Sequence, residues 1–157
     1  MDRALLFPRA MKVESRKFDV VLDVPEDRVI RFPMGLIGME QEKEFVLLER
    51  EQSPRIAWLQ STRNPDLVLP IVSGHELAEE YPDVPLDGAI FSEHLGAVGD
   101  ESAVMVVLSC PPGAVPTVNL ASPLVVNSKT RTGTQIILRG SRYASRELLA
   151  FRAASAA

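Results

Sequence analysis

The clearest structural pattern in the sequence is TVNLASPLVVNSKTRTGTQIIL, from Thr117 to Leu138. Two apolar segments flank a short polar and basic turn, which predicts a β-hairpin whose turn is KTRTG. Gly133 is expected to take a positive φ in that turn, because glycine has no Cβ to clash there. Neither strand carries a histidine, a cysteine or a carboxylate. We therefore expect this hairpin to be scaffold and not a reaction centre.

The same alternation of apolar and polar residues continues along the chain. In KFDVVLDV, one face is formed by Phe18, Val20, Leu22 and Val24, as in a half-buried strand. Eight segments in all are predicted to be strands: 17–24, 28–32, 45–49, 55–60, 67–72, 103–109, 123–127 and 134–138. The 12 prolines exceed the usual share of ~5%. They favour short strands joined by turns over long helices.

Two segments are predicted to be short peripheral helices. SGHELAEEYP begins at Ser73, has Glu76 at the capping-box spacing and ends at Pro82. The second starts near Ser141 and frays among small residues at the end of the chain. The predicted fold class is all-β: a small antiparallel β-barrel-like or sandwich domain with one or two short peripheral helices.

Length and composition indicate one globular domain. The chain has 157 residues, of which 46% are hydrophobic, enough to bury a core without a disulfide or a metal. We expect a single domain over residues 11–150 and a frayed tail over 151–157. The segment MKVESRKFD resembles the beginning of a protein sequence. Residues 1–10 are therefore expected to be a disordered lead-in or to precede an alternative translation start at Met11.

The cysteine content and the lack of long apolar runs favour a cytoplasmic protein with no membrane span. Cys110 is the single cysteine and excludes a disulfide framework within the chain. It follows an apolar run and has no basic residue nearby in sequence, so a buried, inert thiol is predicted. The longest apolar run is far shorter than the roughly 20 residues that a bilayer span needs.

No catalytic or metal-binding pattern is present. His75 and His94 each lack a second histidine or cysteine at ligand spacing. Ser92 and His94 lie in no Gly-x-Ser-x-Gly turn. Trp58 is predicted to lie in the core and not to serve as a cofactor platform. We therefore expect no enzyme activity and no cofactor.

Charge is unevenly distributed along the sequence. No Lys or Arg occurs from Asn64 to Ser128, whereas nine acidic residues do, namely Asp66, Glu76, Glu79, Glu80, Asp83, Asp87, Glu93, Asp100 and Glu101. Two interpretations of this run are open. The acidic residues can lie in solvated loops, or they can form an acidic surface that attracts a basic partner, with Glu76, Glu79 and Glu80 as contacts. Direct nucleic-acid binding is not expected, because the basic cluster around Arg139 has only Tyr143 to stack on a base.

Five motifs in one order resemble the bacterial flagellar assembly factor FliW family. They are FPMGLIGME from Phe32 with Phe45 after it, WLQS from Trp58, NLASPLVVN from Asn119, GTQIIL from Gly133 and YASREL from Tyr143. The resemblance extends from Lys12 to Leu149. It implies a small antiparallel β-barrel-like fold, no catalysis and two protein partners: flagellin, and the translational repressor CsrA once flagellin has been exported.

The motif residues divide into expected contacts and expected scaffold. Met34, Leu36, Ile37 and Met39 lie in a loop with glycines and a proline, where apolar side chains are expected to be exposed and to bind a partner. Pro123 is expected at a strand start or edge, because it lacks an N–H. The expected structural residues are Gln60, Asn119, Pro123, Asn127, Gly133 and Tyr143, with Asn119 and Asn127 bonding local backbone at turns.

Two other functions remain open from the sequence. A small cytoplasmic β-barrel can bind a ligand such as a flavin, although no phosphate-cradling loop is visible here. A hydrolase would require His94 or Cys110 to share a cleft with other catalytic groups. The absorbance spectrum of the purified protein tests the first alternative, and alanine substitution with an activity screen tests the second.

Overall fold

The structure is a computed structural model that describes residues 9–78, 102–138 and 143–153. Its strands are β1 (Ala10–Ser15), β2 (Val20–Pro25), β3 (Ile30–Arg31), β4 (Glu44–Glu49), β5 (Ala57–Ser61), β6 (Val68–Ser73), β7 (Ser102–Ser109), β8 (Thr117–Val118), β9 (Leu124–Asn127), β10 (Thr132–Gln135) and β11 (Glu147–Leu148). Two 3-10 turns, η2 (Glu26–Arg28) and η3 (Gly74–Glu76), are the helical elements in these ranges. None of the helices described has the length and apolar character needed to cross a membrane.

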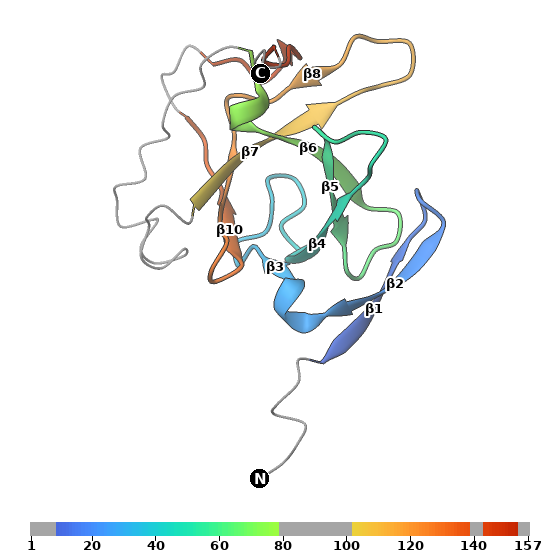
Figure 1. The fold of residues 1–157 in the computed structure, drawn as a ribbon. Helices are drawn as coiled ribbons and strands as arrows, with labels where there is room; N and C mark the ends of the chain where they lie inside the picture. The colour runs from blue at the N-terminus through green and yellow to red at the C-terminus, as the bar shows by residue number, and fades with distance from the viewer. Residues whose placement is uncertain (1–8, 79–101, 139–142, 154–157) are drawn as a thin grey trace.

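Seven of these strands form a closed barrel (Figure 1). The order around the ring is β7, β6, β5, β4, β3, β10 and β9, and β9 then pairs with β7. Closure depends on the length of β7, because its first half pairs with β9 and its second half with β6. All pairs are antiparallel except that of β3 with β10, where Arg31 lies beside Thr132. The all-β antiparallel barrel predicted from the sequence is confirmed.

The barrel interior is filled by apolar side chains from its strands and from the chain that follows β3. The cluster consists of Ile30, Phe32, Leu36, Phe45, Leu59, Ile71, Leu124 and Val126. Phe32 and Phe45 meet edge to face at its centre, with ring centroids 5.7 Å apart. A second cluster under β8 and β11 includes Val106, Leu108 and Val118. Along β4, Phe45 belongs to the barrel cluster and its neighbour Val46 packs on the opposite face of the strand, so both faces are covered.

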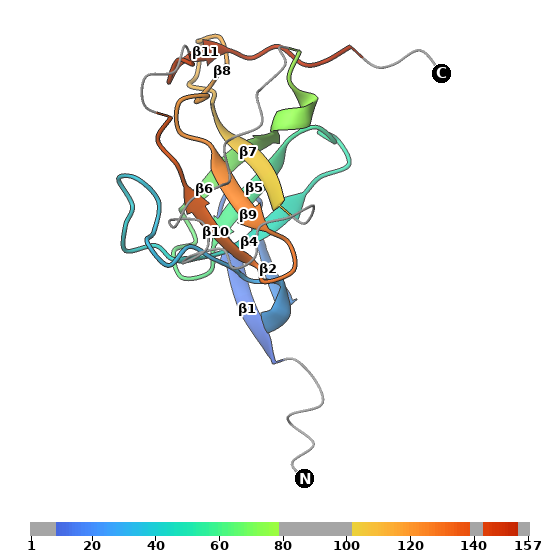
Figure 2. The ribbon, with the colours of Figure 1, turned by 90° about the vertical axis from the view of Figure 1, so that its left-hand side faces the viewer.

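The β1–β2 hairpin packs against the barrel as a separate two-stranded sheet. Val13 of β1, Val29 and Val46 of β4 are buried together between the two sheets. The hairpin projects from one end of the barrel, and β8 and β11 lie at the other end (Figures 1 and 2). Strand β1 is not predicted from the sequence, and its first residue, Ala10, falls in the segment expected to be a lead-in. Residues 1–8 lie outside the described chain.

Three further sequence predictions are wrong. The helix expected from Ser141 is extended chain in its described part, because Glu147 and Leu148 pair with β8. Phe151 then bridges Leu77, so paired chain extends beyond residue 150. The helix expected from Ser73 is, as far as residue 78, only the short turn η3, with the Ser73 hydroxyl accepting a hydrogen bond from His75 N.

Two single residues also differ from expectation. Trp58 is half-buried on the outer face of β5, because its neighbours Ala57 and Leu59 point into the barrel. Its ring meets Phe18 edge to face, at a centroid distance of 5.3 Å, and the Lys17 ammonium lies over it at 4.8 Å. Cys110 was predicted to be buried but is exposed, because it lies one residue beyond the end of β7.

Candidate partner-binding surfaces

The chain from Pro33 to Gln41, here called the Met34 loop, leaves β3 and returns to β4. Two glycines shape it: Gly35 has φ +70° and Gly38 has φ +83°, values that other residues rarely adopt. A Cβ on Gly35 would lie 2.4 Å from the Glu40 carbonyl oxygen. The loop therefore cannot keep this shape with a larger residue at position 35.

Hydrogen bonds hold the Met34 loop in place. Gly35 N donates to Phe32 O and Met39 N donates to Leu36 O, while the Glu40 carboxylate accepts a bond of 3.0 Å from Gly38 N. That bond lowers the pKa of Glu40, because it favours the charged carboxylate. Ile37 N donates to the Gln135 side chain at 2.8 Å, so β10 fixes the tip of the loop.

The four apolar side chains of this loop divide into two pairs. Met34 and Ile37 are exposed, with 62% and 51% of their surface accessible. Leu36 was expected to be exposed, but it is 2% exposed and belongs to the barrel core. Met39 is half-buried against the same core. The inward pair anchors the loop and the outward pair presents apolar surface to solvent, which is a common feature of binding sites.

The acidic residues predicted as contacts are only partly described. Glu76 lies in η3, where its carboxylate is 3.5 Å from the Arg55 guanidinium. Asp66 also has an ion-pair partner, Arg16. Glu79 and Glu80, with the other five acidic residues of the run, fall outside the described ranges. Figure 2 places η3 at the upper right and the Met34 loop at the left, so Glu76 and the loop form two separate surfaces.

The Arg55 side chain links Glu76 to the C-terminal segment. Its Nη1 donates to Arg152 O at 3.0 Å, and its guanidinium lies 5.2 Å from the centre of the Phe151 ring. Main-chain bonds from Ala78 N to Ala150 O and from Arg152 N to Glu76 O add to this contact. The surface around Glu76 is therefore built by three segments that are distant in sequence.

Several motif residues stabilise turns of the barrel. Gln60 is buried, and its Nε2 lies 3.1 Å from the carbonyl oxygens of Ser61, Asn64 and Leu67. Asn119 Oδ1 accepts a bond from Ser122 N, and Asn127 Oδ1 accepts from Lys129 N and Thr130 N. These are the local backbone bonds expected for the two asparagines.

The other motif residues have packing roles. Pro123 directly precedes β9, and its carbonyl accepts a bond from Ile136 N. Tyr143 packs against the second apolar cluster. Gly133 lies within β10 and has no positive φ; Arg131 has it instead, at 57°. Gly133 is needed for another reason, since a Cβ there would lie 2.6 Å from Phe32 Cε1.

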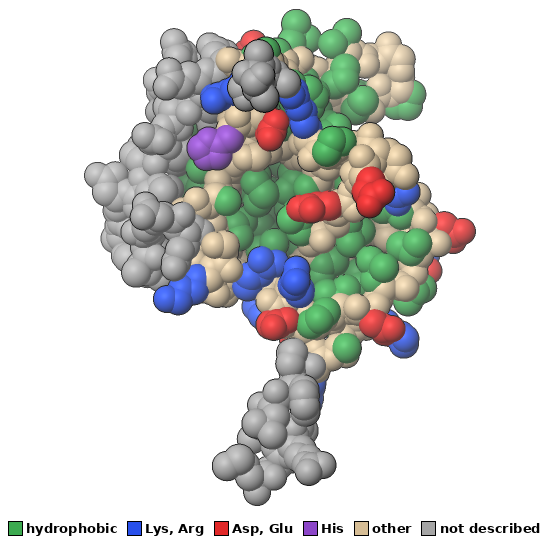
Figure 3. Space-filling model, in the orientation of Figure 1, with side chains coloured by type: hydrophobic (Ala, Val, Ile, Leu, Met, Phe, Trp, Pro, Cys, Tyr) green, Lys and Arg blue, Asp and Glu red, His purple; other side chains and the backbone are tan. Residues whose placement is uncertain are grey.

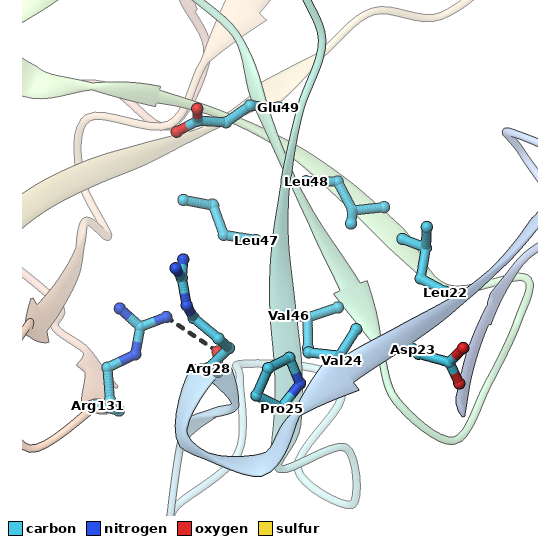
Figure 4. Close-up of a pocket in the computed structure, with 10 residues that line it drawn as sticks. All are labelled: Leu22, Asp23, Val24, Pro25, Arg28, Val46, Leu47, Leu48, Glu49 and Arg131. Atoms are coloured by element: carbon cyan, nitrogen blue, oxygen red, sulfur yellow. Dashed lines mark hydrogen bonds between the residues drawn. The ribbon is translucent and has the colours of Figure 1, made fainter. Parts of the chain in front are cut away.

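A groove of about 460 Å³ lies beside β4. Its lining residues are Leu22, Asp23, Val24, Pro25, Arg28, Val46, Leu47, Leu48, Glu49 and Arg131. Figure 3 shows basic side chains gathered next to apolar surface on this face, and Figure 4 shows Arg28 and Arg131 side by side. No sequence pattern predicts this pair, because 103 positions separate the two arginines.

Histidine, cysteine and acidic side chains are the groups that would hold a metal ion. No group of three or more histidine, cysteine or acidic side chains is placed to hold a metal within the described residues. His75 is on η3, and His94 lies beyond what is described.

Comparison with known proteins agrees with this description. The family model described as FliW protein matches residues 12–149. A flagellar assembly factor FliW from Natranaerobius thermophilus is 34% identical over 145 residues, covering 88% of this chain and 92% of the relative. That from Heliobacterium modesticaldum is 33% identical over 144 residues, covering 88% and 90%.

A solved structure extends the agreement to three dimensions. The crystal structure of the flagellar assembly factor FliW superposes with a TM-score of 0.78 at 29% sequence identity, covering 89% of this chain and 97% of the solved chain. A family model, full-length relatives and a solved structure thus agree over the same region. The chain belongs to the FliW family of flagellar assembly factors.

Proposed function

We propose that this chain acts in the cytoplasm by binding proteins and not by catalysis. In this proposal it binds newly made flagellin, and export of flagellin frees it to bind the translational repressor CsrA. Binding to CsrA relieves the block on flagellin translation, so synthesis follows secretion. The proposal extends to this chain what resemblance to the FliW family implies. No step requires a cofactor, a membrane or direct contact with nucleic acid.

The observation that carries the proposal is the exposed pair Met34 and Ile37 on a hydrogen-bonded loop. When a partner covers large apolar side chains, the free energy gained is about 25 cal/mol per Å² of apolar surface removed from water. Because the loop is already fixed by Gln135 and Glu40, binding would order little additional chain, which favours affinity. We assign this surface to flagellin.

We assign the acidic surface around Glu76, with Glu79 and Glu80, to CsrA. An RNA-binding repressor needs basic surface to hold phosphates, and an acidic surface on this chain would attract it at a distance. Because Glu76 is in an ion pair with Arg55, the proposed attraction depends largely on Glu79 and Glu80. Exchange between partners then follows from mass action, because flagellin lowers the concentration of chain available to CsrA.

The test is a pull-down from cell lysate with the tagged full chain, made with flagellin export active and with export blocked. Flagellin should co-purify when export is blocked, and CsrA should replace it when flagellin leaves the cell. Recovery of neither protein in either condition would refute the proposal. An absorbance spectrum with flavin bands would support the alternative of a ligand-binding barrel.

A further inference from the structure

Strand β4 has a free edge next to the groove. It pairs with β5 along Phe45–Glu49, but with β3 only at Glu44 and Phe45. Because Glu44 O accepts a bond from Thr62 N, the even-numbered residues of β4 direct their main-chain groups towards β5. The N–H and C=O groups of Leu47 and Glu49 therefore point to the other edge. They have no main-chain partner there among the described residues.

The groove lies in front of that edge. In Figure 4 the Leu47 side chain points to one side of β4, and Val46 and Leu48 point to the other. Leu22 and Val24 of β2 form the far wall. An extended chain laid along the edge would bond to Leu47 and Glu49 and direct alternate side chains to the two sides of the groove. This is the arrangement by which peptides add a strand to a sheet.

Charge at one end of the groove selects the kind of chain. Arg131 Nη2 donates to Arg28 O at 2.9 Å, which brings the two side chains together. Within the described residues, the buried Arg131 Nε has no hydrogen-bond acceptor. The Arg28 guanidinium also has no acceptor there. Of the two carboxylates in the lining, Asp23 is paired with Lys12. The Arg28 guanidinium and Arg131 Nη1 thus retain donors for a carboxylate, a group that arginine binds through charge-assisted hydrogen bonds.

We propose that this groove binds an extended segment of a protein partner that adds as a strand to β4 at Leu47 and Glu49. The segment places one carboxylate against Arg28 and Arg131 and carries apolar side chains at alternating positions. The inference rests on the proposed function only in taking the partner to be a protein. It gives the groove a role separate from those of the Met34 loop and Glu76.

The probe is an acetylated and amidated hexapeptide, Thr-Val-Glu-Val-Thr-Val, added to the full-length protein labelled with ¹⁵N. The amide signals of Leu47 and Glu49 should shift and their hydrogen exchange should slow. A peptide with lysine in place of glutamate should bind about tenfold more weakly, because it lacks the charge-assisted bonds. Two further peptides are N-methylated, each at one of the two alternate sets of backbone nitrogens. Only one of them should bind more weakly, because only one set of nitrogens would face β4.

Two protein variants complete the test. Arg28→Glu should abolish the preference for the glutamate peptide, whereas Arg146→Glu, an exposed arginine near β11 at the other end of the barrel, should keep it. Unchanged Leu47 and Glu49 amides, or an Arg28→Glu variant that binds like the parent, would overturn the inference. A concentration-dependent dimer through the β4 edge would also overturn it, by showing a second copy as the occupant.

The same measurements separate this inference from the proposed function. If flagellin or CsrA binds the parent protein and the hexapeptide leaves the β4 edge unchanged, the proposed function stands and the groove inference fails. If the hexapeptide binds as described and neither protein binds, the groove inference stands and the assigned partners are wrong.

Discussion

The Gln135 side chain accepts a hydrogen bond from Ile37 N at 2.8 Å, although the two residues are 98 positions apart in the sequence. The same amide donates to Ser122 O at 3.1 Å. Gln135 therefore connects the tip of the Met34 loop to β10 and to the chain before β9. A side chain in the barrel wall thus controls how Met34 and Ile37 are presented to solvent.

Removing this link should weaken flagellin binding more than it weakens the fold. Gln135→Ala removes the bonds to Ile37 N and Ser122 O. The bond to the loop is worth about 1 kcal/mol, so we expect roughly fivefold weaker binding in calorimetry with purified flagellin. Gln135→Glu keeps an acceptor for Ile37 N and should bind more tightly than Gln135→Ala. Equal affinities for the parent and Gln135→Ala would show that the loop keeps its shape without this contact.

Substitutions at neighbouring positions of the Met34 loop should have opposite effects. Met34→Asp should weaken flagellin binding with little change in melting temperature, because Met34 is exposed. Leu36→Asp should unfold the domain, since it places a carboxylate in the barrel core at a cost of several kcal/mol. Val115→Asp, at a residue 66% exposed elsewhere, is the matched control and should bind normally. A stable Leu36→Asp protein would contradict the position of Leu36 in the core.

Gly133 should tolerate no larger side chain while Phe32 is present. A Cβ at Gly133 would lie 2.6 Å from Phe32 Cε1, and Phe32 cannot move freely because it is fully buried against Phe45. We expect Gly133→Ala to lower the free energy of unfolding by about 1–3 kcal/mol in urea titrations. Adding Phe32→Leu should make the alanine less costly than it is alone. Purely additive effects would mean that the two positions do not touch.

The sequence predicted the barrel well because alternation reports directly which strand face is buried. It also placed turns at Asn119 and Asn127, where short polar side chains bond the nearby backbone. It could not predict that Leu36 points inward and Ile37 outward, because the Met34 loop has no regular period. Its orientation depends on Gly35, Gly38 and distant contacts.

Two other failures have the same origin in long-range contacts. The segment after Ser141 has the composition of a helix, yet Glu147 and Leu148 are extended because β8 offers them a partner. Tertiary pairing overrides the weak local preference for helix. Arg28 and Arg131 come together only through closure of the barrel between β3 and β10. No local pattern in either segment indicates that meeting.

The acidic surface makes a prediction about salt. Reversing charge at Glu76, Glu79 and Glu80 should weaken the CsrA complex and flatten the dependence of its affinity on salt concentration. Stability should change little, because exposed ion pairs such as Glu76 with Arg55 contribute only ~0–1 kcal/mol. Asp66→Lys, in a comparable exposed ion pair with Arg16, is the control. If affinity and its salt dependence are both unaltered by the triple reversal, CsrA does not bind this surface.

Glu40 should make the Met34 loop sensitive to acid. The bond from Gly38 N lowers the pKa of Glu40 in the folded protein, so the charged carboxylate stabilises the loop at neutral pH. A lowered pKa means that this stabilisation is complete above the unfolded pKa of about 4.3 and is lost as the pH falls through the lower folded value. Amide exchange at Gly38, measured by NMR and corrected for intrinsic rates, should therefore accelerate below pH ~4. In Glu40→Gln the side chain keeps an acceptor oxygen without a titrating charge, so the acceleration should disappear. If the two proteins respond to acid in the same way, another group controls the loop.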